Sequence, residues 1–180
     1  MNKMSYVKRG MITAACIALC VVLPMAFHSI QNAGAVFGPM HIPVLLCGLI
    51  CGAPLGLLCG LAGPLLSSVL TGMPVAAYLP AMLVELAAYG LLTGFGMGIF
   101  RTKHRFLDLY LSMLTAMVGG RILAGAAKAL IFAPGSLSMA AWVTGYFVTA
   151  LPGIVLQLLL VPAMVYALEK ARLIPARYPR

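Results

Sequence analysis

Residues 38–60, GPMHIPVLLCGLICGAPLGLLCG, join a histidine flanked by prolines to an apolar run that carries a glycine at every fourth position. In a helix, small residues at this spacing form a narrow face on which a neighbouring helix backbone packs closely. A phosphate-binding loop is disfavoured, because no Lys-Ser or Lys-Thr pair follows the glycines. Pro54 interrupts the series, so the stretch predicts two short helices joined by a tight turn at 52–54. The glycines are Gly48, Gly52, Gly56 and Gly60, and Gly94 and Gly98 repeat the spacing later in the chain.

The composition of the whole chain places these helices in a membrane. Of the 180 residues, 63% are hydrophobic and 8% are charged, and the mean hydropathy is +1.06. These values lie outside the range of soluble domains. A hydrocarbon core about 30 Å thick takes roughly 20 helical residues to cross, so the chain has room for at most about six or seven spans and for no soluble catalytic domain.

The apolar runs predict one all-α domain, an integral membrane bundle of six transmembrane helices. The connections at 28–39, 71–75 and 133–139 contain no Lys or Arg, whereas the two termini and the break at 101–105 are basic. Basic residues mark the cytoplasmic side of a membrane, so an even number of spans with both termini in the cytoplasm fits this pattern. The formal net charge of +9 therefore reflects topology and not nucleic-acid binding. The predicted spans are 11–27, 40–53, 55–72, 76–100, 107–132 and 140–168.

The first apolar run admits a second interpretation as a secretory signal, with Ala33-Gly34-Ala35 as a cleavage-like site. The run at 11–27 is long for the apolar region of a signal, and a spanning helix fits the charges that follow it. The five cysteines all lie in apolar segments of the first third of the chain. They lack His or carboxylate partners at a metal-binding spacing, so we expect ordinary apolar residues and neither a metal site nor a disulfide framework. The cysteines are Cys16, Cys20, Cys47, Cys51 and Cys59.

Three ionisable residues fall inside predicted spans, where charge is costly and usually functional. Glu85 and Arg121 are expected at similar depth in the outer half of the membrane, and Lys128 follows Arg121 by seven residues on the same helix face. One interpretation is a Glu85–Arg121 pair that holds two helices together, with Lys128 reaching for the interface. The other is that this face lines an outward-opening cavity whose surplus positive charge suits an anionic ligand.

Polar and aromatic residues gather toward the same predicted outer side. The aromatic residues also fit an interfacial belt, and the histidine also fits a helix start that bonds to loop backbone. No Ser or Cys nucleophile accompanies the histidine, His28-Ser29 lacks a third orienting residue, and no protease, transferase or nucleotide-binding motif is visible. We therefore expect a protein that binds or moves something and is not an enzyme. The residues are Gln31, Asn32, His41, Tyr78, Trp142 and Tyr146, with Gln157 in the last span.

The chain resembles the substrate-binding S components of energy-coupling factor (ECF) vitamin transporters. The resemblance rests on the length, the six predicted spans, the basic break before span five and the pattern Ala14-x-x-x-Ala18 in span one. The segments PMHIPVLLCGLICG and LPGIVLQLLLVPAMVYALEKA are similar to those of one branch of the family. The resemblance implies that Ala14 and Ala18 dock on a shared transmembrane T component.

The resemblance also implies a multi-pass protein of the bacterial plasma membrane that works with a T component and two ATPase subunits and has no cofactor of its own. The loop containing Gln31 and Asn32 would be a lid over a pocket lined by Glu85, Arg121 and Lys128. The substrate would be a small water-soluble vitamin or precursor. The excess of cations favours a carboxylate-bearing compound, with pantothenate as the first hypothesis. Queuosine precursors, a pyridoxine-like or pyrimidine compound and cobalamin precursors remain alternatives.

Three other classes of protein remain open from the sequence. A self-contained secondary transporter or channel would transport without any ATPase. A small membrane enzyme would lose activity when Glu85 or His41 is replaced. A structural assembly factor would need no small ligand.

Overall fold

The computed structural model describes residues 4–26, 33–132 and 138–176, and these ranges contain only helices, turns and short connections. The helices follow one another along the chain as α1 (Tyr6–Ala26), α2 (Ala33–Phe37), α3 (His41–Cys51), α4 (Ala53–Thr71), α5 (Leu79–Ile99), α6 (Arg105–Ala127), the π-helical η1 (Lys128–Phe132), α7 (Met139–Val143), the π-helical η2 (Thr144–Thr149) and α8 (Leu151–Lys170).

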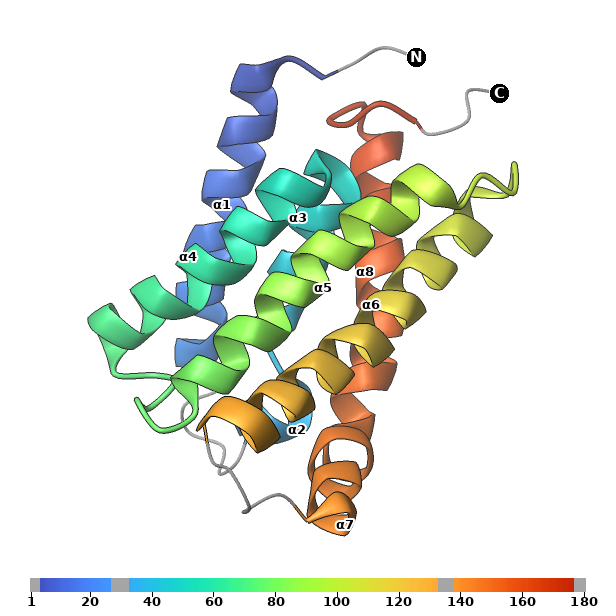
Figure 1. The fold of residues 1–180 in the computed structure, drawn as a ribbon. Helices are drawn as coiled ribbons and strands as arrows, with labels where there is room; N and C mark the ends of the chain where they lie inside the picture. The colour runs from blue at the N-terminus through green and yellow to red at the C-terminus, as the bar shows by residue number, and fades with distance from the viewer. Residues whose placement is uncertain (1–3, 27–32, 133–137, 177–180) are drawn as a thin grey trace.

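The helices form a bundle whose two ends differ in charge. The start of α1, the α5–α6 turn and the end of α8 lie at one end, called here the terminal end (Figure 1). The α4–α5 connection and α7 lie at the opposite end (Figure 1). Apart from Arg121 and Lys128, the Lys and Arg residues of the described chain gather at the terminal end, a distribution that the positive-inside pattern associates with one side of a membrane. They are Lys8, Arg9, Arg101, Lys103, Arg105, Lys170 and Arg172.

Within the described residues, five helices are long and apolar enough to cross a membrane. They correspond to the predicted spans at 11–27, 55–72, 76–100, 107–132 and 140–168. The segment predicted at 40–53 forms α3, which has 11 residues and is therefore about 16 Å long, too short to cross alone. It still returns the chain toward the terminal end, where α4 begins (Figure 1).

Helix α3 is the core of the bundle. Every residue from His41 to Leu49 is buried, and α3 packs against α1, α4, α5 and α8. The longer helices bury only part of their surface and carry large apolar side chains outward, such as Val69, Ile122 and Leu159. A surface of that kind suits lipid or another membrane protein.

The glycine face predicted for close packing is present between α3, α4 and α5. A Cβ added at Gly48 or Gly56 would collide with the backbone carbonyl of Gly90, and at Gly48 also with the Thr93 side chain. A Cβ added at Gly60 would collide with the backbone carbonyl of Leu86. Gly94 packs in the same way against the start of α4. The backbones of these helices touch because no side chain separates them.

Two of the predicted packing glycines have other roles. Gly52 has nothing nearby that a Cβ would meet, but its φ of +92° lies in a region that L side chains avoid. It forms the turn between α3 and α4, and Pro54 follows in the first turn of α4. Gly98 also meets nothing within 4 Å, so its assignment to helix packing was wrong. Gly98 has the four-residue spacing, but no described helix packs against the face of α5 on which it lies.

The last predicted span is interrupted where the sequence expects one helix. Residues 139–170 form α7, η2 and α8, with a break at Ala150 before Pro152. Proline cannot donate the backbone hydrogen bond that would continue the preceding turn. The cysteines are free thiols and all five are buried, mainly where α1 meets α3 and α4.

Candidate functional site

Three ionisable side chains from three helices meet inside the bundle. Glu85 Oε1 lies 3.4 Å from His41 Nε2 and 3.8 Å from Arg121 Nε. His41 and Glu85 are each 8% exposed and Arg121 is 4% exposed. These residues are called the His–Glu–Arg cluster below. Glu85 and Arg121 lie at a similar height along their helices, as predicted. Glu85 is six residues after the start of α5, and Arg121 is six residues before the end of α6.

The contacts of His41 bear on the charge of the cluster. Its Nδ1 lies 3.2 Å from the carbonyl oxygen of Gly38, while its Nε2 faces the Glu85 carboxylate. A neutral imidazole donates from only one nitrogen, whereas an imidazolium donates from both. When the imidazole holds both protons, both contacts are satisfied and the His–Glu–Arg cluster has a net charge of +1.

Aromatic rings enclose the cluster on two sides. Arg121 Cζ lies 5.9 Å from the centre of the Tyr89 ring and 5.4 Å from that of Phe147. The His41 and Tyr89 rings meet edge to face at 5.1 Å. The Tyr89 hydroxyl donates to the Met117 carbonyl at 3.4 Å. The guanidinium is thus held between rings, where cation–π attraction is stronger than in water.

Trp142 extends this aromatic wall across α6. Its indole lies against Gly125, one turn beyond Arg121, where a Cβ would overlap the ring. The Trp142 ring also contacts those of Phe147 at 5.5 Å and Tyr146 at 6.1 Å. Tyr146 is partly buried.

Gln157 ties α8 to the segment that leads into α3. Its Nε2 donates to the carbonyl oxygens of Phe37 at 3.3 Å and Gly38 at 3.4 Å. The Gly38 carbonyl therefore accepts from Gln157 and faces His41 as well. Gly38 has a φ of +54°, and a Cβ on it would clash with His41. Glycine is required there for the histidine to reach the carboxylate.

Three buried polar atoms beside the cluster have no hydrogen-bond partner among the described residues: Arg121 Nε, Trp142 Nε1 and Gln157 Oε1. Burying such an atom without a partner costs roughly 1–3 kcal/mol. Native proteins rarely leave several together unless water, an ion or a ligand satisfies them. The set contains two donors and one acceptor on three different elements.

The structure brings together some of the predicted site residues and separates others. One connected group of side chains inside the bundle contains His41, Glu85, Arg121, Trp142 and Tyr146. Tyr78 is 67% exposed at the start of α5, and Lys128 begins η1, partly exposed and without an ion pair in the described chain. Gln31 and Asn32 lie outside the described residues, as does His28-Ser29.

The sequence reasoning missed two aromatic residues of the site. Tyr89 lies four residues after Glu85 and therefore on the same helix face, a signal that was available. Phe147 carries no comparable signal, because its position depends on the π-helical turn η2. Within the described ranges, no three His, Cys, Asp or Glu side chains come together as metal ligands would.

The residues predicted to dock a partner lie on another surface. Ala14 and Ala18 are exposed on α1 and line an apolar groove of about 450 Å³ between α1 and α4. The rest of its lining is Ile17, Val21, Val22, Leu66 and Leu70. Small residues in its lining let another helix backbone come close to α1.

Comparison with known proteins identifies the family. The model of the family "ECF transporter, substrate-specific component" matches residues 8–165. A search of the curated proteins finds no match, and a search of the solved structures finds none. The family match runs from within α1 to within α8 and includes both the His–Glu–Arg cluster and the α1–α4 groove. The chain is therefore a member of the family of substrate-specific components of ECF transporters.

Proposed function

We propose that this chain captures a small anionic nutrient at the His–Glu–Arg cluster and passes it across the membrane with an ECF T component and two ATPase subunits. Family membership supports a transporter subunit over a membrane enzyme. The observation that carries the binding site is the set of unpartnered buried atoms around Arg121. A carboxylate that reached Arg121 would gain charge-assisted hydrogen bonds in a place sheltered from water.

Substrate chemistry follows from the charges and the rings. The cluster has one carboxylate, Glu85, beside Arg121, and the Glu85–Arg121 contact at 3.8 Å is longer than a hydrogen bond. Arg121 therefore retains donor capacity for a second anion. The indole N–H of Trp142 and the amide oxygen of Gln157 suit a ligand with polar groups of both kinds. Pantothenate, with a carboxylate, an amide and hydroxyl groups, is the first compound to test.

The experiment begins with native mass spectrometry of the gently purified protein, which identifies a co-purifying metabolite directly. Binding of pantothenate, or of the metabolite found, is then measured by calorimetry. Arg121→Ala should weaken binding at least about tenfold, because a buried charged partner is worth roughly 1.5–3 kcal/mol. Lys170→Ala, which removes an exposed cation near the end of α8, should change it less than about twofold.

Arg121→Lys separates charge from geometry, since a lysine keeps the charge but loses the planar fork. We expect intermediate binding for this variant. Equal effects of Arg121→Ala and Lys170→Ala in folded protein would remove the site assignment. Transport by the chain alone in liposomes, without ATPases, would instead favour a self-contained carrier.

A further inference from the structure

Helix α7 and the π-helical η2 face the bundle through three aromatic side chains. Within residues 139–149, Trp142, Tyr146 and Phe147 are partly buried and the other residues are exposed. Neither element contains a buried residue, and η2 also touches α2 and α8. The position of this segment, called the aromatic cover below, therefore depends on how the three rings pack against the bundle.

Trp142 packs where α6 has no side chain. A Cβ added at Gly125 would overlap Nε1, Cε2 and Cδ1 of the indole, all of which belong to its five-membered ring. Gly125 is buried inside α6 and its φ is not positive, so the backbone would accept alanine, which is the better helix former. The requirement for glycine at this position therefore comes from the indole.

A series of contacts connects Gly125 with the guanidinium of the His–Glu–Arg cluster. The Trp142 ring meets the Phe147 ring edge to face at 5.5 Å, and the centre of the Phe147 ring lies 5.4 Å from Arg121 Cζ. Arg121 precedes Gly125 by four residues, so both lie on the same face of α6. Phe147 thus covers Arg121 in the position that the contact between Trp142 and Gly125 allows.

An alanine at position 125 should displace the indole and not the helix. Helix α6 packs closely against α5 nearby, since a Cβ added at Gly120 would collide with the fully buried Tyr89 ring. The aromatic cover has no buried residue that would hold it in the same way. We therefore expect Trp142 to move away from α6 and to take Phe147, five residues further along the same segment, with it.

We propose that Gly125 is a positioning residue of the binding site, because its missing side chain lets Trp142 pack against α6 and hold Phe147 over the Arg121 guanidinium. The inference rests on the proposed function, in which an anion binds to Arg121. Charge-assisted hydrogen bonds are stronger where water is excluded. Displacing the aromatic cover should therefore weaken binding, although no group that contacts the anion is replaced.

The first test needs no substrate. Phenylglyoxal modifies the arginine side chains that it reaches, and peptide mass spectrometry gives the rate at each arginine of the full chain in neutral detergent. Arg121 should react at least about fivefold faster in Gly125→Ala than in the unchanged protein, because overpacking moves the aromatic cover. Gly119→Ala is the matched control on α6, where the added Cβ would meet only Cδ1 at the end of the Leu92 side chain. It should leave the rate within about twofold.

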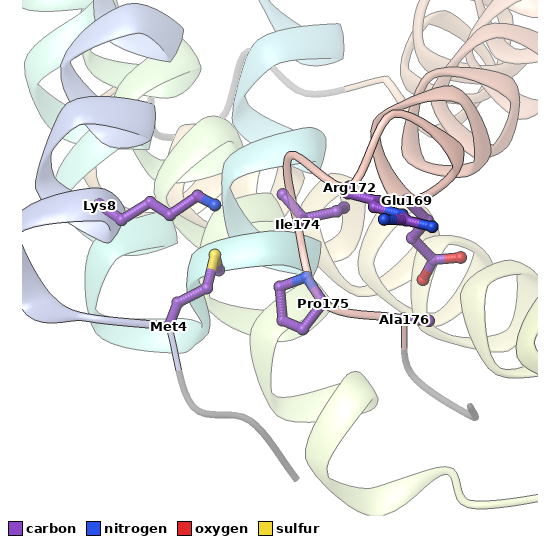
Figure 2. Close-up of a pocket in the computed structure, with 7 residues that line it drawn as sticks. All are labelled: Met4, Lys8, Glu169, Arg172, Ile174, Pro175 and Ala176. Atoms are coloured by element: carbon purple, nitrogen blue, oxygen red, sulfur yellow. The ribbon is translucent and has the colours of Figure 1, made fainter.

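Arg105 reports whether a variant loosens the whole bundle. It begins α6 at the terminal end, and its Nη1 lies 2.9 Å from Glu169 Oε2. Glu169 lines a pocket between the start of α1 and the end of α8 (Figure 2). Gly125 lies near the other end of α6, so displacement of Trp142 should leave the rate at Arg105 unchanged. Equal acceleration at Arg105 and Arg121 would mean general loosening and would overturn the proposal.

Trp142→Phe tests whether the indole transmits the effect. It removes Nε1, the indole atom nearest to the added Cβ, so Gly125→Ala should accelerate the reaction of Arg121 much less in this background than when Trp142 is present. Residues in contact show such coupling, whereas independent residues do not. Equal acceleration in the two backgrounds would overturn the proposal. A melt of each variant confirms that the fold is intact.

The second test measures binding. Pantothenate, or the metabolite found, should dissociate about tenfold faster from Gly125→Ala than from the unchanged protein or Gly119→Ala, because the ring over Arg121 is displaced. Unchanged dissociation would overturn the positioning role and leave the proposed function in place. Absence of any bound anion in the unchanged protein would instead remove the proposed function, while the phenylglyoxal rates would still show whether Gly125 positions the aromatic cover.

Discussion

Glu85 is the residue on which the charge of the candidate site depends. It is the one acidic side chain in contact with both His41 and Arg121. If it serves only to hold His41 and Arg121 in the bundle, it competes with an anionic substrate for Arg121. If it contacts substrate itself, it must face a positive or hydrogen-donating group. The two roles predict opposite responses to removal of its charge.

We expect Glu85→Gln to bind pantothenate, or the co-purifying anion, several-fold more tightly than the unchanged protein. The amide preserves the shape of the side chain and raises the charge of the cluster by one, which favours an anion in a low-dielectric site. The measurement is calorimetric titration. Glu169→Gln is the matched control, because it removes the same charge at the terminal end, and it should leave affinity within about twofold. Lost binding in folded Glu85→Gln protein would assign Glu85 to a substrate contact.

At the residue scale, the sequence predicted the depth of Glu85 and Arg121 because helix rise converts residue number directly into height. Their contact was one of two interpretations left open. Which residues surround them depends on helix rotation and on the Gly38 turn, and neither is visible in a hydropathy pattern. Lys128 was expected on the same face as Arg121. It follows α6 directly as the first residue of the π-helical η1 and is partly exposed, and its part in the site stays a prediction.

Among the elements, the contact of α4 with α5 shows how small residues determine helix distance. Gly56 and Gly90 face each other so closely that a Cβ on either would meet the backbone of the other. Backbone cannot move aside as a flexible side chain can. The four-residue glycine spacing therefore determines the position of α5, and with it the position of Glu85.

Gly56→Ala should lower the free energy of unfolding by about 1–3 kcal/mol, because it overpacks a rigid contact. Gly98→Ala is the matched control on α5, since nothing lies within 4 Å of its added Cβ. It should be neutral or slightly stabilising, because alanine has the higher helix propensity. A melt followed by a thiol-reactive dye suits both variants, since all five cysteines are buried in the folded protein. An equal melting temperature for the two variants would contradict the packing role of Gly56.

Hydropathy located the long helices well and failed to distinguish α3 from them. A helix buried in protein and a helix bathed in lipid are equally apolar, so composition cannot tell the two apart. The length of α3 is limited by Gly38 and Gly52, which both have positive φ. The turn at Gly52 and Pro54 was predicted from the sequence, and so was the start of α3, to within one residue of His41. The positive φ of Gly38 was not predicted. The interruption before Pro152 was missed because the surrounding residues continue the apolar pattern.

Across the whole molecule, the candidate binding site and the candidate docking surface occupy different places. The His–Glu–Arg cluster lies between α3, α5 and α6, and the groove with Ala14 and Ala18 lies between α1 and α4. A change in the groove need not disturb the cluster. Binding and uptake are therefore separable by mutation.

Ala14→Trp or Ala18→Trp should abolish ATP-dependent uptake and leave ligand binding within about twofold. The large ring fills the groove and keeps another helix away from α1. Ala15→Trp is the matched control, because Ala15 is exposed on the same helix and lies outside the groove lining. Uptake of labelled pantothenate, or of the metabolite found, by cells that also produce the T component and ATPases is the measurement. Normal uptake in the Ala14 and Ala18 variants would count against docking at this surface.

The chain has a single tryptophan, and its indole rests on Gly125 beside Phe147 and Tyr146. Tryptophan emission, excited at a wavelength that the seven tyrosines do not absorb, therefore originates from this one neighbourhood. Any molecule that enters beside Arg121 changes the polarity around that fluorophore. Occupancy can thus be followed by an intrinsic optical signal, without an attached label.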